Sequence, residues 1–166
     1  MSKSSMVVAF TLFLSPSVAA QTTIYSTFGP GDSYAQNTGY ALLGVQWIAA
    51  PFTYTGTSGD FLFDFRVGIA ADGNITASFW VGNDMNTATV LESWNIFAPR
   101  GIQTFTSVLN PTLSNGQVYW VMLSVTEPTS SDWPGWALND QQLSGAFEWS
   151  ADSGENWTPS SQLLPA

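Results

Sequence analysis

Polar and apolar residues alternate with a period of two along much of the chain, which is typical of β-strands that bury one face. In the segment 59–69, one face would hold Phe61, Phe63, Phe65, Val67 and Ile69, and the other Leu62, Asp64, Arg66 and Gly68. A second alternating run extends from Ile75 to Val81. Because the Asp72-Gly73 pair between the runs favours a tight turn, the pattern predicts a hairpin closed at that pair.

Further strands are predicted in the segments 44–54, 90–97, 103–109, 118–126, 135–138 and 144–150. Breaks rich in Gly, Pro, Asn and Ser separate them, and no stretch shows a helical stripe with caps. Many short strands without intervening helices predict an all-β fold. We expect an antiparallel β-sandwich of the jelly-roll kind.

The N-terminus has the layout of a secretory signal peptide. Lys3 precedes an apolar run from Met6 to Leu14, and the small residues Val18-Ala19-Ala20 follow. The alternative is a retained membrane anchor, but the run is about half of the ~20 residues that span a bilayer. We therefore expect a signal peptide over 1–20, a single β-sandwich domain over 21–166, and secretion or display at the cell surface. No later stretch is apolar enough for the mature chain to insert into a membrane.

Charge and composition exclude several classes of function. Twelve acidic residues face three basic ones, which gives a formal net charge of −9. A nucleic-acid partner is not expected, because neutralising a phosphate backbone takes several Lys or Arg. The chain has no Cys and no His, which rules out disulfides, thiolate nucleophiles, zinc sites of Cys or His, and triads with a His base.

Four short motifs give the chain a resemblance to a known family. They are Phe28-Gly-Pro-Gly-Asp-Ser-Tyr34, Leu91-Glu-Ser-Trp94, Gln117-Val-Tyr-Trp-Val121 and Ser150-Ala-Asp-Ser-Gly-Glu-Asn-Trp157. In this order they resemble the bacterial exported β-sandwich proteins called choice-of-anchor domains, which are often associated with a PEP-CTERM sorting tag. The resemblance implies a cell-surface or matrix protein that is not an enzyme. Such proteins usually end in a Pro-Glu-Pro tag, an apolar helix and basic residues, and the sequence up to Ala166 has none of these.

The last of these motifs is similar to the Asp-box found on hairpin turns. In Ser150-x-Asp152-x-Gly154-x-x-Trp157, the Ser and Asp side chains would bond the turn backbone, Gly would supply a positive φ, and Trp would pack beneath. This structural role is preferred to a catalytic one. Asp152 and Glu155 are weak candidates for binding calcium, although no regular calcium-loop spacing is present, and no other cofactor is expected.

A group of aromatic and polar residues offers a candidate binding site. Trp133 and Trp136 lie near Asn139 and Asp140, and flat rings with nearby amides and carboxylates suit the recognition of sugars. Most Trp residues in a small domain belong to its core, and Trp47, Trp94 and Trp120 are assigned to packing. Trp133 and Trp136 are equally compatible with exposure and with burial.

The sequence thus favours a non-catalytic protein that binds an extracellular carbohydrate or matrix polymer. One alternative is a purely structural surface or adhesion module. The other is a polysaccharide-acting enzyme that uses two of the carboxylates. Its candidates are Asp60, Asp64, Glu92, Glu127, Asp132, Asp140 and Glu148; of these, Asp64 and Glu92 are expected to face solvent on strands. A groove lined by Trp133 and Trp136 would favour binding, facing carboxylates an enzyme, and a smooth surface a structural module.

Overall fold

A computed structural model describes residues 25–125 and 133–166, and within them the protein is all-β. The strands are β1 (Ala35–Ala41), β2 (Trp47–Thr53), β3 (Asp64–Ala71), β4 (Gly73–Val81), β5 (Thr89–Ala98), β6 (Gly101–Thr106), β7 (Val118–Val125), β8 (Gly135–Leu138), β9 (Ser144–Ser150) and β10 (Thr158–Leu163). None of the described residues forms a helix of the length and apolar character needed to cross a membrane.

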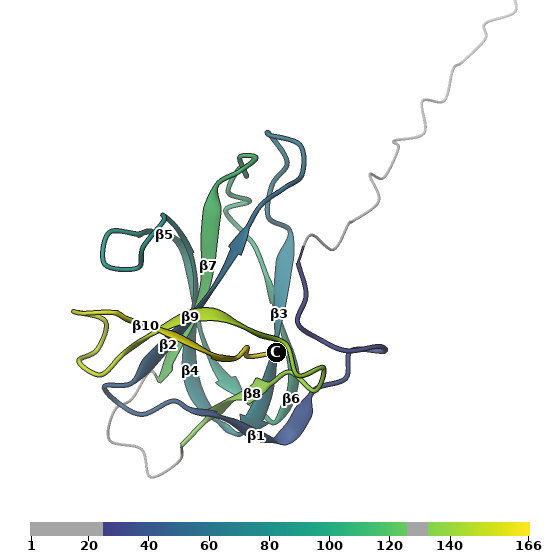
Figure 1. Cartoon of the computed structure of the whole chain (residues 1–166), viewed down its shortest axis with the longest axis vertical. Coiled ribbons are helices and arrows are strands. Elements are labelled where there is room, and N and C mark those ends of the chain that lie inside the picture. The colour runs from purple at the N-terminus through teal and green to yellow at the C-terminus, as the bar shows by residue number, and fades with distance from the viewer. Residues whose placement is uncertain (1–24, 126–132) are drawn as a thin grey trace, which may run out of the picture.

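The strands form two antiparallel sheets packed face to face, so the predicted β-sandwich is confirmed (Figure 1). The small sheet has the order β1-β8-β3-β6, and the large sheet has the order β10-β9-β2-β7-β4-β5. Without the β9–β10 hairpin, the orders 1-8-3-6 and 2-7-4-5 are those of a jelly roll, in which the chain passes back and forth between two sheets. The hairpin extends the large sheet beyond β2.

Alternate side chains of both sheets fill the space between them. The main core consists of Leu42, Ile48, Val67, Ile69, Ile75, Ala77, Ala98, Phe105, Leu123, Trp136 and Phe147. Stacked rings continue it towards one end, where the centroids of Phe65 and Phe105 lie 5.0 Å apart and those of Phe79 and Tyr119 lie 5.4 Å apart. Burial of such large apolar surfaces supplies the main driving force for folding.

The predicted hairpin between the segments 59–69 and 75–81 is wrong. Strand β3 belongs to the small sheet and β4 to the large one, with Asp72 at the corner between them. Ile69 and Ile75 are both fully buried in the main core. The two strands therefore bury their apolar faces across the sandwich, and an edge-to-edge pair would place both faces on one side of a sheet.

The limits of several strands also differ from the prediction. The alternation proposed from Gly59 begins only at Asp64: Phe61 and Phe63 are exposed, whereas Leu62 is buried. This segment pairs with the loop after β6, where Leu62 N–H donates to Pro111 O at 3.0 Å. In this pairing Leu62 points inward and its two phenylalanine neighbours point outward, the opposite of the prediction. Strands β1 and β10 were not predicted, because most of their residues are exposed and show no apolar alternation.

Candidate functional site

A hollow of about 300 Å³ lies on the outer face of the small sheet. Its floor consists of small residues from three strands: Gly39 and Ala41 of β1, Gly135 of β8, and Ala70 and Ala71 of β3. These residues meet because β1 and β3 both pair with β8, where Ala41 and Ala71 lie opposite Gly135. Asn37, Arg100 and Trp133 complete the lining.

Trp133 stands out of the surface at this hollow, with 66% of its area exposed. The residue that follows it is fixed, since Pro134 is buried and its carbonyl accepts a hydrogen bond of 2.8 Å from Leu42 N–H. An indole with its backbone anchored and its ring exposed can stack on the apolar face of a ligand.

Arg100 belongs to the turn between β5 and β6 and also lines the hollow. Its backbone N–H donates to Asp72 Oδ1 at 2.6 Å, and its Nη1 donates to Asn37 Oδ1 at 3.3 Å. Asn37 lies where the register of β1 against β8 is irregular, between Ala35 and Gly39. Two polar side chains are thus linked to each other beside Trp133.

The predicted site residues are only partly brought together. Trp136 is 2% exposed, and its Nε1 donates to Ala166 O at 2.6 Å within the main core. Asn139 is 1% exposed and bonds the backbone of Leu143 and Leu164. Both side chains are buried and hydrogen-bonded within the protein, so neither offers a surface to a ligand.

Asp140 is exposed but does not line the hollow. Hydrogen bonds from Gln141 and Ser33 lower the pKa of its carboxyl. Of the predicted residues, the hollow therefore holds Trp133, and it adds Arg100 and Asn37, which the sequence reasoning missed. The scarcity of basic residues could have drawn attention to Arg100, whereas nothing in the sequence singles out Asn37.

The Asp-box-like turn between β9 and β10 makes the contacts that its sequence predicts. Ser150 Oγ donates to Asp152 Oδ1 at 2.7 Å and accepts the Gly154 N–H at 2.8 Å. Asn156 donates to both oxygens of Asp152, from its backbone at 2.9 Å and from Nδ2 at 2.7 Å. These bonds, with those from Asn156 the strongest, lower the pKa of Asp152 to about 2. Gly154 has a φ of +86°, a conformation that favours glycine.

Trp157 of this turn packs into a second hydrophobic cluster, on the outer face of the large sheet. The cluster consists of Ala49, Met85, Trp120, Met122 and Trp157, with Trp47, Trp80, Ala88 and Val118 packed against it. The segment 82–88 covers it: Asn86 Oδ1 accepts the Trp157 N–H at 2.9 Å, and Trp120 Nε1 donates to Gly82 O at 2.7 Å. The indole nitrogens of Trp47 and Trp80 are buried and have no hydrogen-bond partner among the described residues. The Trp residues here are structural.

The carboxylates proposed for an enzyme fall into different environments. Glu92 was expected to face solvent, but it is buried and accepts bonds from Ser107 Oγ at 2.5 Å and Val108 N–H at 2.8 Å. It thereby anchors the loop after β6. Asp60 accepts a hydrogen bond from Tyr54, which raises the pKa of that tyrosine to about 12.

Glu148 is partly buried and has Asp84 as an acidic neighbour. Burial, followed by the charge of Asp84, raises its pKa, and Met85 N–H donates to it at 3.3 Å. Asp64 is exposed, and Glu127 and Asp132 lie outside the described residues. Within the part of the chain that is described, no group of three or more acidic side chains gathers as a metal site, and Glu155 of the calcium candidates is exposed.

No family model matches the sequence, and no curated protein or solved structure matches it either.

Proposed function

We propose that this is a secreted or cell-surface protein that binds an extracellular carbohydrate or matrix polymer, without catalysing a reaction on it. The observation that carries the proposal is the exposed Trp133 beside a hollow that also presents Asn37 and Arg100. The extracellular location rests on the leader-like pattern of Met1 to Ala20.

The chemistry of the hollow suits a saccharide. A sugar ring has an apolar face of C–H groups that can lie on the indole of Trp133, and hydroxyls at its edge that an amide or guanidinium can bond. The small side chains of the floor let a flat ring approach the sheet closely. Shallow sites of this kind gain affinity by repeating the contact along a polymer.

The experiment measures binding of the purified protein to a panel of neutral and charged polysaccharides, by affinity electrophoresis and by quenching of tryptophan fluorescence. Trp133→Ala is compared with Trp149→Ala, because Trp149 is also exposed but does not line the hollow. Loss of an aromatic anchor at the centre of a site should weaken binding by about tenfold or more.

We expect Trp133→Ala to lose binding and Trp149→Ala to retain it, with both variants still folded by circular dichroism at the temperature of the binding assay. Binding that survives Trp133→Ala would remove the hollow as the site. A protein that binds no polysaccharide in the panel would instead be a structural surface module.

A further inference from the structure

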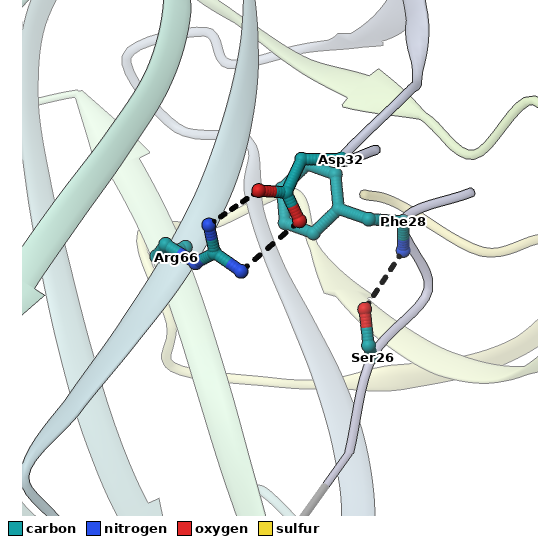
Figure 2. A network of polar contacts seen from close by, with 4 residues as sticks. All are labelled: Ser26, Phe28, Asp32 and Arg66. Atoms are coloured by element: carbon teal, nitrogen blue, oxygen red, sulfur yellow. Dashed lines mark hydrogen bonds and ion pairs between the residues drawn. The ribbon is translucent and has the colours of Figure 1, made fainter. Parts of the chain in front are cut away.

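The two arginines of the described residues are used in opposite ways. Figure 2 shows the guanidinium of Arg66 forming a two-pronged ion pair with Asp32, at 2.7 Å and 3.1 Å. The ring of Phe28 lies 5.9 Å from the same guanidinium. This arrangement fixes the segment before β1 to β3, so the charge of Arg66 is already compensated within the protein.

Arg100 has no carboxylate within ion-pair distance among the described residues. Within the described part of the chain, its side chain makes one hydrogen bond, to the neutral amide oxygen of Asn37. This bond uses one of the five N–H donors of a guanidinium. The carboxylate of Asp72 lies on the same corner but accepts the backbone N–H of Arg100. The side chain of Arg100 is thus exposed, positively charged and positioned beside Trp133.

We propose that the hollow selects saccharides that carry an anionic group, a carboxylate or a sulfate ester, and that Arg100 binds that group. This inference rests on the proposed function, and it adds the class of ligand. A planar guanidinium matches either group through paired hydrogen bonds, while Trp133 supports the sugar ring that bears it.

The net negative charge of the protein opposes the binding of an anionic polymer. With twelve acidic residues against three basic ones, the protein repels a polyanion at most of its surface. A preference for an anionic polymer over its neutral counterpart therefore has to come from a local contact. Removing that contact should reverse the preference, because only the general repulsion would remain.

The test compares polymers that share a backbone and differ in charge, at constant ionic strength. One pair is polygalacturonate and its fully methyl-esterified form, and the other is dextran sulfate and dextran. The variant is Arg100→Gln, and the matched control is Arg66→Gln, which removes the other guanidinium from an exposed ion pair. Trp133→Ala reports on the saccharide contact itself.

We expect the parent to bind the charged member of at least one pair about tenfold more tightly than the neutral member. Selection in the first pair identifies a carboxylate, and selection in the second a sulfate ester. Arg100→Gln should abolish the preference, and Arg66→Gln should keep it.

Equal affinity for both members of each pair, or a preference that survives Arg100→Gln, would overturn the assignment. If either result is found and Trp133→Ala still abolishes binding, the hollow binds carbohydrate but does not select anionic groups. Failure of the parent to bind any of the four polymers also overturns the selectivity, whereas the proposed function is decided by the wider panel.

Discussion

The outer faces of the two sheets carry tryptophans in two different situations. On the large sheet, Trp80 and Trp120 lie opposite each other on β4 and β7, beneath the segment 82–88 and the turn that carries Trp157. In Figure 1 this segment, next to β5, and the turn of the β9–β10 hairpin project on the same side of the molecule. The part of the outer face of the large sheet that carries these tryptophans is therefore covered as a second core.

The outer face of the small sheet is covered only in part. The segment before β1 covers part of it, where the ring of Tyr34 lies against Gly68 and Asp32 binds Arg66. Another part of this face is the hollow with its floor of glycine and alanine. The difference shows that a tryptophan near these outer faces is buried where another segment closes over it and exposed where none does.

The largest expected effect on stability distinguishes the buried Trp157 of the second cluster from the exposed Trp133. Trp157→Ala should lower the free energy of unfolding by about 3–5 kcal/mol, because it leaves a cavity in the second cluster. Trp133→Ala should change it by about 0.5 kcal/mol or less, since the ring is mostly in solvent. Urea denaturation measures both, and similar losses in the two variants would contradict the distinction between the faces.

A smaller effect is expected from the turn that seals the large sheet. Ser150→Ala should cost about 1–3 kcal/mol, because the Gly154 N–H and Asp152 lose the buried hydroxyl that bonds them. Ser161→Ala on exposed β10 is the matched control and should be close to neutral. If both variants unfold at the same urea concentration, the side-chain bonds of the turn do not hold it in place.

The same turn predicts a pH dependence of stability. The pKa of Asp152 is about 2 in the folded protein against 3.8 for an ordinary aspartate. The unfolded state binds a proton first, so the stabilisation is complete above about pH 4 and is lost as the pH falls towards 2. Asp152→Asn should therefore be less stable than the parent at pH 7, and the gap should close on acidification. A gap in the unfolding midpoint that stays constant from pH 7 to pH 2 would contradict this.

A small effect on stability is also expected from a substitution at the floor of the hollow. A Cβ added at Gly135 would lie 3.5 Å from Ala70 Cβ and 3.7 Å from Tyr40 O, which are ordinary contacts. Gly135→Ala should thus change the free energy of unfolding by about 1 kcal/mol or less, while its methyl group occupies space on the floor of the hollow. Calorimetric titration with a polysaccharide that the parent binds should show loss of affinity, and unchanged affinity would place the ligand elsewhere.

Much of the fold follows from the sequence because strand periodicity is a local property. The segments 135–138 and 144–150 coincide with β8 and β9, and the Asp-box-like motif forms its turn because the bonds of Ser150 and Asp152 reach partners within a few residues. The partners of strands are not local. Asp72-Gly73 has the composition of a hairpin turn, yet β3 and β4 separate into two sheets because each finds better burial across the core.

The candidate site was less accessible to sequence reasoning. Trp133 and Trp136 are three positions apart and have similar neighbours, but only the second points into the core. Arg100 and Asn37 are far from Trp133 in the chain and meet it only through the pairing of β1, β8 and β3.

The sequence by itself determined that this protein is built from strands, that its acidic, Cys-free and His-free composition closes off whole classes of chemistry, and that residues 150–157 form a bonded turn. The tertiary structure alone decided which strands share a sheet, which tryptophans a loop covers, and which of the two arginines of the described residues forms an ion pair. The reason is physical: periodicity and turn chemistry act over a few residues, whereas burial and ion pairing depend on contacts between residues that are distant in the chain.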